Sequence, residues 1–240
     1  MKGLLLIPAL NEQHSIGQVV RAAKARISDI LVVDDGSSDL TQAAATSAGA
    51  IVLRLEKNMG KGEALKVGFR YALEHNCDWV VTMDGDGQHD PDDLVNFLPL
   101  LGQYDLLLGN RMEDSASVPL LRRVANLCSS RIVSALCGQR IFDSQTGFRG
   151  YKATFLGHVS LNASHYDLET EVIIKAARQG FRIGHCRIKT IYGGEVSRYK
   201  NFRDSLRFLR VALKSLRALV LPEPLPALPD EEEKSRAMRG

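Results

Sequence analysis

One stretch of the sequence decides the fold, Val80-Val81-Thr82-Met83-Asp84-Gly85-Asp86-Gly87-Gln88-His89-Asp90-Pro91-Asp92. Residues 79–83 have the length and apolar composition of a buried strand, and carboxylates separated by glycines follow at once. Open α/β sheets bind ligands at the carboxyl ends of their strands, where these carboxylates are expected to lie. The stretch therefore predicts a central strand with a functional site at its end.

Three oxygen-bearing side chains alternate with glycines in this stretch. On an extended segment Asp84, Asp86 and Gln88 point the same way, and Gly85 and Gly87 let backbone or ligand approach closely. Carboxylate and amide oxygens suit a hard divalent cation, so we predict that these three residues bind one. A solvated acidic loop is the open alternative.

A calcium loop of the EF-hand type does not fit the same residues. Counted from Asp84, the sixth position is His89, where the sharp turn needs Gly. The twelfth position is Val95, where that loop needs a bidentate Glu. The spacing therefore excludes this class of site.

Length and composition are those of one ordinary soluble domain with a substantial core: 240 residues, 45% hydrophobic and 25% charged. The four cysteines form no Cys-x-x-Cys pair, so neither a zinc site nor a disulfide framework is indicated. No apolar run approaches the roughly 20 residues of a membrane span. We expect a cytoplasmic protein with no nucleic-acid partner.

Strand-like runs alternate with helical patterns over the first half of the chain. Apolar runs occupy residues 4–7, 30–33, 51–53, 79–83 and 106–108. Helical patterns cover 16–23 and 62–75, and further helices are expected to open at Asp39 and at Asp90-Pro91. This order predicts an α/β fold with a mostly parallel central sheet and helices on both faces.

Polar residues also follow the other predicted strands, in the segments 8–12, 32–39 and 58–65. Each alone is explained equally well by helix capping. Together they place polar groups repeatedly at one edge of the sheet. The signatures of phosphate-loop and dinucleotide-binding proteins are missing, but Gly60-Lys61-Gly62 is suited to bring a cation and backbone N–H groups to a phosphate.

Five segments, taken in order, resemble the family 2 glycosyltransferases with the GT-A fold: Pro8-Ala9-Leu10-Asn11-Glu12, 32–39, 58–65, 84–92 and Asp143-Ser144-Gln145-Thr146-Gly147-Phe148-Arg149. Within that family the chain looks most like the dolichol-phosphate mannosyltransferases and other polyprenyl-phosphate glycosyltransferases. The resemblance spans roughly residues 4 to 200. Several motifs in the right order are more specific than any one of them.

The resemblance implies roles for individual residues. It implies that the nucleotide sugar is held by Pro8, Ala9, Glu12, Asp34, Asp35 and Lys61. It implies that the metal, Mg²⁺ or Mn²⁺, is held by Asp84, Asp86 and Gln88. Asp84, Asp86 and Arg111 are the implied catalytic residues, and an acceptor phosphate is assigned to Arg111, Arg123 and Asn126.

The implied activity is metal-dependent, inverting transfer of a hexose, with mannose from GDP-mannose preferred, onto a polyprenyl phosphate. A phosphate acceptor is already ionised, so Asp167-Leu168-Glu169, where relatives that glycosylate hydroxyls carry a base, is interpreted as structural or orienting. The alternatives are a UDP-sugar donor, a hydroxyl acceptor, or nucleotide-sugar binding without turnover.

The sequence divides into a catalytic domain at 1–200, a basic amphipathic helix at 201–221 and a disordered Pro-rich, acidic tail at 222–240. In the helix, apolar residues recur every three or four positions beside a row of arginines and lysines. Such a helix lies on an anionic membrane surface or packs on its parent domain, and both alternatives stay open.

Overall fold

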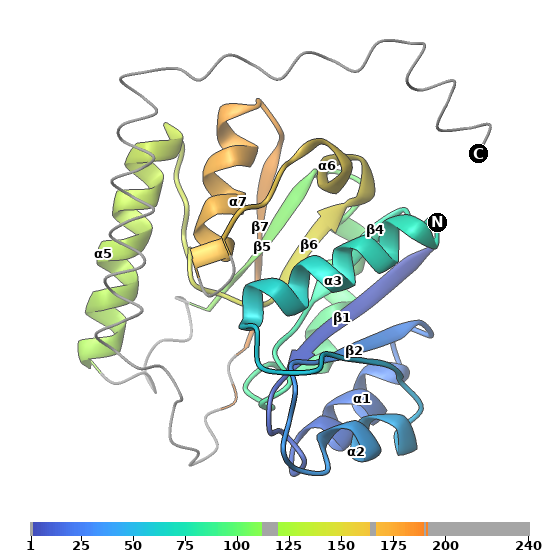
Figure 1. Cartoon of the computed structure of the whole chain (residues 1–240). Helices are drawn as coiled ribbons and strands as arrows, with labels where there is room; N and C mark the ends of the chain where they lie inside the picture. Colours follow the sequence, from blue (N-terminus) through green and yellow to red (C-terminus); the bar gives the residue numbers. More distant parts are fainter. Residues whose placement is uncertain (1, 112–119, 164–166, 190, 192–240) are drawn as a thin grey trace, which may run out of the picture.

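The computed structural model describes residues 2–111, 120–163, 167–189 and 191 (Figure 1). Within them, seven strands form one sheet in the order β3-β2-β1-β4-β6-β5-β7. Strand β6 is antiparallel to both of its neighbours, and the other pairs are parallel. The strands are β1 Gly3–Ala9, β2 Ile30–Asp34, β3 Ile51–Arg54, β4 Trp79–Thr82, β5 Leu106–Asn110, β6 Arg149–Lys152 and β7 Ile183–Arg187.

Helices cover both faces of this sheet. Helices α1 and α2 lie beside β1 and β2, and α5 packs on α7 (Figure 1). The described helices are α1 Ile16–Lys24, α2 Thr41–Ser47, α3 Lys61–Glu74, α4 Leu94–Phe97, α5 Leu120–Cys137, α6 Ala153–His158 and α7 Asp167–Arg178, with 3₁₀ turns at Pro91–Asp93 and Leu98–Leu100.

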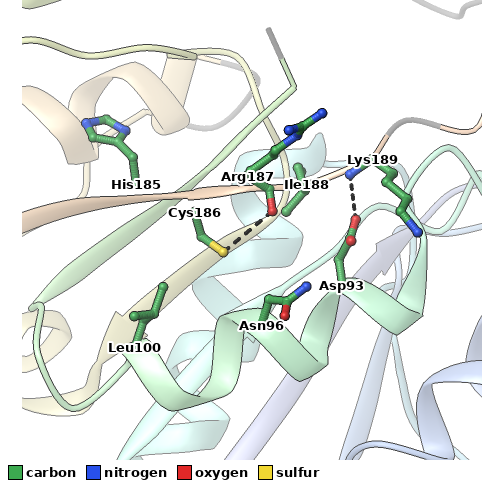
Figure 2. A pocket seen from close by; sticks show the side chains of 8 residues that line it. All are labelled: Asp93, Asn96, Leu100, His185, Cys186, Arg187, Ile188 and Lys189. Atoms are coloured by element: carbon green, nitrogen blue, oxygen red, sulfur yellow. Dashed lines mark hydrogen bonds between the residues drawn. The ribbon is translucent and has the colours of Figure 1, made fainter. Parts of the chain in front are cut away.

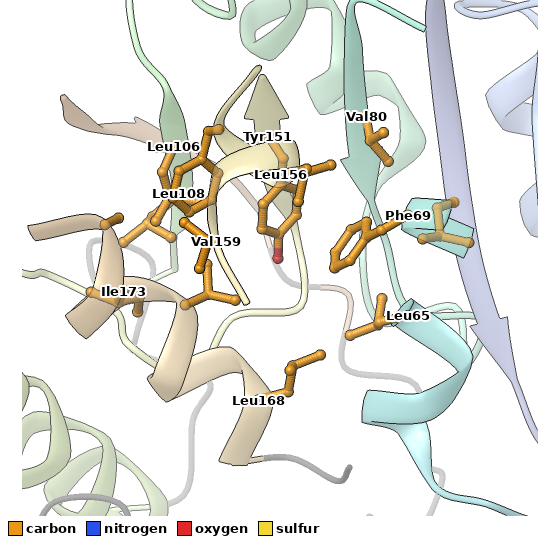
Figure 3. Packing of buried hydrophobic residues seen from close by; sticks show 14 of the residues in the cluster. Leu65, Phe69, Val80, Leu106, Leu108, Tyr151, Leu156, Val159, Leu168 and Ile173 are labelled. Atoms are coloured by element: carbon orange, nitrogen blue, oxygen red, sulfur yellow. The ribbon is translucent and has the colours of Figure 1, made fainter. Parts of the chain in front are cut away.

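The core has two halves because successive side chains of a strand point to opposite faces. Leu4 and Leu6 of β1 belong to the cluster that contains α3, α6 and α7, whereas Leu5 and Ile7 belong to the cluster with α1 and α4. Figure 3 shows part of the first cluster, where Phe69 of α3 lies against Tyr151 of β6 with ring centroids 4.9 Å apart. A strand buried on both faces reads as a continuous apolar run.

The α/β class, the mostly parallel sheet and the helices on both faces are confirmed. The five predicted strands lie where the sequence put them, and the Asp90 carboxylate accepts a hydrogen bond from the backbone N–H of Asp92, as the predicted cap requires. The helix expected there is broken into 3₁₀ turns around the four-residue α4. Pro99, which has no N–H to donate, stands in the second of these turns.

The predicted domain boundaries lie largely outside the described residues. Residues 192–200 of the predicted catalytic domain, the predicted basic helix at 201–221 and the tail at 222–240 are not described. Among the described helices, none combines the length and the apolar character that crossing a membrane requires.

Candidate active site

The carboxyl ends of β1, β2 and β4 lie at one edge of the sheet. The register pairs Ala9 with Asp34 at the ends of β1 and β2, and Leu6 with Thr82 at the end of β4. Because β6 runs the other way, its first residue, Arg149, pairs with Thr82. The segment 143–148 that precedes β6 therefore enters the same edge as Asp84, which follows β4.

Asp84 faces two donors. The Lys61 Nζ lies 2.6 Å from its Oδ1, and the His89 Nε2 lies 3.4 Å from its Oδ2. Burial alone would raise the pKa of Asp84, but the Lys61 ammonium and the His89 N–H together hold that pKa well below its usual range. Asp84 is therefore a carboxylate at any pH near neutral.

Lys61, the first residue of α3, is shared between two carboxylates. Its Nζ also lies 2.9 Å from Oε1 of Glu169 in the first turn of α7, and the two side chains are only 15% and 8% exposed. Burial would lower the pKa of Lys61, but the two carboxylates raise it far above its usual value. The sequence placed Lys61 near a phosphate; in the described structure it bridges two acidic side chains.

Asp86 lies in the same loop as a second, less stabilised carboxylate. Its Oδ1 accepts a hydrogen bond from the backbone N–H of Gln88 at 3.0 Å. Burial raises the pKa of Asp86, and the neighbouring charge of Asp84 raises it further. The charge of Asp84 therefore disfavours the ionised form of Asp86, and a cation bound between the two carboxylates would stabilise that form.

The donor set fits a divalent cation that shares its coordination with a ligand. Within the described residues, no three His, Cys, Asp or Glu side chains form a complete protein cage for a metal. Mg²⁺ is typically bound by one or two carboxylates together with substrate phosphates, and Asp84 with Asp86 supplies such a pair. The glycine at 147 adds to the fit, because it leaves the space beside the Asp84 carboxylate open where any Cβ would fill it.

The predicted nucleotide-binding residues at the end of β1 are connected to this loop. The carbonyl of Ala9 accepts the backbone N–H of Asp35 at 2.8 Å. The Ser15 hydroxyl lies 2.8 Å from the carbonyl of Gly85 and 3.1 Å from the carboxylate of Glu12. Pro8, which pairs with Val33 in the sheet, belongs to the same edge.

Asp34 and Asp35 are both buried, and the carboxylate of each accepts hydrogen bonds from backbone N–H groups. Asp34 Oδ1 accepts the N–H of Ser37 at 2.8 Å, and its Oδ2 has no hydrogen-bond partner within the described residues, although the Arg54 Nε lies 3.8 Å away. Asp35 accepts the N–H groups of Met59 and Gly60, at 2.7 and 2.9 Å. Asp35 thereby fixes the turn that presents Lys61.

The predicted acceptor residues are in different surroundings. Arg111 donates from Nε and Nη2 to the two carboxylate oxygens of Asp143, at 2.7 and 3.1 Å. Arg123 is exposed on α5, and Asn126 of the same helix is half-buried. The structure thus brings Arg111 to the segment 143–149 and leaves Arg123 on the surface of α5.

The segment 143–149 connects Arg111, helix α5 and the end of β4. No role was assigned to the residues of this segment from the sequence. Asp143 binds Arg111, and Ser144 lies within hydrogen-bond distance of Ser129 and Ser130 of α5, at 3.0 and 3.3 Å. The carbonyl of Gly147 accepts the Thr82 hydroxyl at 2.8 Å. The polar run 143–146 was the sequence signal that could have indicated this role, and the structure buries Asp143, Ser144 and Thr146 of it.

Arg149 links the segment 143–149 to the first turn of α7. It is fully buried, and its guanidinium donates to the carbonyl oxygens of Ser144, Thr146 and Glu169. Glu169 was interpreted from the sequence as structural or orienting. Its backbone is held by Arg149, and its carboxylate is held by Lys61.

A cavity of about 420 Å³ lies elsewhere, between α4 and β7 (Figure 2). Asp93, which accepts the backbone N–H of Lys189 at 2.6 Å, lies at its wall, as do His185 and Cys186. None of the residues predicted to bind nucleotide, metal or acceptor lines it. The carboxylate pair of Asp84 and Asp86 lies at the sheet edge, so we place the candidate active site there and not in this cavity.

Comparison with known proteins agrees with the motifs and the fold. The chain is 33% identical over 213 residues to a UDP-N-acetylglucosamine–dolichyl-phosphate N-acetylglucosaminyltransferase of Methanococcus voltae, covering 78% of this chain and 85% of that protein. It is 31% identical over 196 residues to an undecaprenyl-phosphate mannosyltransferase of Micrococcus luteus, covering 76% and 81%.

Among solved structures, the fold resembles the glucosyl-3-phosphoglycerate synthase of Mycobacterium tuberculosis, crystallised with Mg²⁺ and uridine diphosphate. The TM-score is 0.72 at 20% identity, over 93% of this chain and 81% of the other. Residues 5–159 match the family described as Glycosyl transferase family 2. The chain is therefore an enzyme that belongs to the family 2 glycosyltransferases.

Proposed function

We propose that this glycosyltransferase transfers a hexose from a nucleotide-diphosphate sugar to a polyprenyl phosphate, with mannose from GDP-mannose as the first donor. The observation that carries the proposal is the segment 143–149. Its Gly147 accepts a hydrogen bond from Thr82 at the end of β4 and lies beside the Asp84 carboxylate, and its Asp143 binds Arg111. One segment therefore contacts both the proposed donor site and the proposed phosphate site. Relatives named for undecaprenyl-phosphate and polyprenol transfer of mannose support the same acceptor class.

In this proposal Asp84, Asp86 and Gln88 hold a Mg²⁺ or Mn²⁺ ion with the donor diphosphate. The ion, when bound, supplies Lewis-acid stabilisation for the charge that develops on the departing diphosphate. The ends of β1 and β2, with Pro8, Ala9, Glu12, Asp34 and Asp35, hold the nucleotide.

The acceptor side requires positioning more than proton transfer. A polyprenyl phosphate is ionised at neutral pH, so its oxygen attacks the anomeric carbon without a general base, and the configuration inverts. Arg111, Arg123 and Asn126 position that phosphate. The two guanidinium groups bind phosphate oxygens through paired N–H donors, and the Asn126 amide supplies a further N–H donor. The ion pair of Glu169 with Lys61 supports an orienting role for Glu169 over that of a base.

A UDP-sugar is the second candidate donor. It is favoured by a relative named for transfer from UDP-N-acetylglucosamine and by a fold neighbour crystallised with uridine diphosphate. A peripheral position at a membrane, through residues 201–221, stays a prediction from the sequence.

A radiolabelled-donor screen tests the proposal. Purified protein is incubated with GDP-mannose, UDP-glucose or UDP-N-acetylglucosamine, with and without a short-chain polyprenyl phosphate, and the product is extracted into organic solvent. We expect transfer from one donor that requires the lipid phosphate and is abolished by chelator.

The matched controls are Asp84→Asn and Asp86→Asn, which keep the size of each side chain while removing its charge. Both variants are expected to fold and to lose metal-dependent transfer. Transfer that persists in both variants, or in chelator, would contradict the metal role. Transfer to a sugar hydroxyl without lipid phosphate would contradict the acceptor.

A further inference from the structure

Both oxygens of the Asp84 carboxylate already face a donor in the described structure. Lys61 Nζ lies 2.6 Å from Oδ1, and His89 Nε2 lies 3.4 Å from Oδ2. A divalent cation that binds Asp84 places two positive charges next to these donors. The Lys61 ammonium then lies close to a second positive charge, and like charges at such distances repel strongly in a partly buried site, so the contact of Lys61 with Asp84 is the one that the cation opposes.

The two donors differ in their freedom to move. The His89 side chain is 2% exposed, and its ring lies edge-on to the Phe148 ring with centroids 5.6 Å apart. Lys61 instead has a flexible four-carbon stem and a second partner, because its Nζ is 2.9 Å from Oε1 of Glu169. The ammonium can leave Asp84 without becoming an unpaired buried charge.

We propose that Lys61 is a resident counter-ion of Asp84 that the catalytic cation displaces, and that Glu169 is the positioning residue that keeps the displaced ammonium at the site. The inference rests on the proposed function, since it takes Asp84 and Asp86 as the metal ligands. Without a metal, Lys61 neutralises a carboxylate that would otherwise repel Asp86. With a metal, Glu169 retains the ammonium beside the metal site, where a donor phosphate would need a positive charge.

The position of Glu169 is fixed independently of Lys61. Its backbone carbonyl accepts a hydrogen bond from the fully buried Arg149, and its side chain is 8% exposed. The Glu169 carboxylate is therefore a fixed second ion-pair partner for the Lys61 ammonium. The same geometry explains why a lysine that the sequence assigned to a phosphate contacts two acids in the described structure.

Calorimetric titration of the full chain with Mn²⁺, with and without GDP or UDP, tests this inference without measuring activity. Lys61→Met removes the competing cation, so Mn²⁺ should bind about tenfold or more tightly. Glu169→Gln removes the second ion-pair partner of Lys61 and leaves Lys61 paired with Asp84 alone, so Mn²⁺ should bind about tenfold more weakly. Glu169→Asp, which keeps the charge, should recover part of the lost affinity.

Glu171→Gln is the matched control. It removes a carboxylate two positions along α7, one that pairs with Lys175 at 2.7 Å, and should leave Mn²⁺ affinity at the wild-type value. Thermal unfolding of each variant separates an effect on the site from an effect on the fold. Where Lys61→Met does not fold, Lys61→Gln carries the same expectation.

The outcomes separate the inference from the proposed function. Wild-type protein that binds Mn²⁺, together with a Lys61→Met variant that in the absence of nucleotide binds Mn²⁺ equally or more weakly, overturns the counter-ion role and leaves the metal site intact. An effect of Glu171→Gln equal to that of Glu169→Gln overturns the positioning role, because charge alone then explains the change. Wild-type protein that binds no Mn²⁺ under any condition overturns both proposals.

Discussion

Arg111 and Asp143 form a two-bond ion pair in which the Nε and Nη2 of the arginine donate to both carboxylate oxygens, at 2.7 and 3.1 Å. Asp143 is fully buried, whereas the Arg111 side chain is 20% exposed. An arginine assigned to a lipid phosphate is therefore also the partner of a buried charge. Substitutions at Arg111 and at Arg123 should separate these two roles.

Arg123→Ala should lower transfer to the acceptor without changing stability or nucleotide affinity. Arg123 is exposed on α5, so its removal should change the free energy of unfolding by less than about 0.5 kcal/mol. Loss of a charge-assisted contact worth roughly 1.5–3 kcal/mol should lower transfer to polyprenyl phosphate about tenfold or more, with nucleotide affinity unchanged. Transfer assays over a range of acceptor concentrations measure the effect. Full activity in this variant would remove Arg123 from the acceptor site.

Arg111→Ala should impair both acceptor use and folding. It leaves the Asp143 carboxylate buried without the guanidinium, which should cost roughly 2–4 kcal/mol of unfolding free energy. Urea unfolding followed by the fluorescence of Trp79, the one tryptophan of the chain, measures this cost. A variant as stable as the wild type would show that the pair contributes little to the fold.

The same pair predicts a pH dependence. Burial would raise the pKa of Asp143, but Arg111 and two backbone N–H groups lower it below its usual value. A carboxyl whose pKa is lower in the folded than in the unfolded state stabilises fully above the unfolded value of about 3.9, and that contribution is lost as the pH falls through the folded value. The stability difference between wild type and Asp143→Asn should be constant from about pH 8 to 5 and should shrink below about pH 4. Urea unfolding of both proteins across this pH range measures the difference. A stability difference that stays constant below pH 4 would contradict the prediction.

Gly147→Ala should disturb the metal site while sparing the rest of the fold. A Cβ at this position would lie 2.4 Å from Oδ2 of Asp84, so the carboxylate must move away from its present contacts. We expect Mn²⁺ affinity to fall at least about tenfold, by calorimetry. Gly157→Ala on α6 is the control, because nothing lies within 4 Å of its Cβ. Equal affinities in the two variants would show that the space beside Asp84 does not matter.

The sequence predicted the sheet because β1, β2 and β4 are apolar runs buried on both faces, and it predicted the Asp84 loop because carboxylates follow β4 directly. It did not predict β6, whose residues include Arg149 and Lys152 and carry no apolar run. It also could not predict that Lys61 meets Glu169, since residues 108 positions apart contact only after α3 and α7 pack on one face. Pairings of this kind are set by tertiary structure and leave no local pattern.

Arg149→Lys tests the connection that the sequence did not reveal. Arg149 is fully buried, and its guanidinium donates to three carbonyl oxygens on two segments, those of Ser144, Thr146 and Glu169. A lysine ammonium keeps the charge but is a point donor, so it cannot reproduce the planar fork that reaches all three. Carbonyls left without donors in the interior should cost roughly 2–4 kcal/mol of unfolding free energy.

The control for this substitution is Arg182→Lys, at a side chain that is 63% exposed and pairs with Asp105 at 3.7 Å. It should change the unfolding free energy by less than about 0.5 kcal/mol. Urea unfolding followed by Trp79 fluorescence compares the two variants on one scale. Because Arg149 also fixes the turn that carries Glu169, Mn²⁺ affinity in folded Arg149→Lys protein should fall in the direction expected for Glu169→Gln. A variant with wild-type stability and affinity would show that neither segment depends on Arg149.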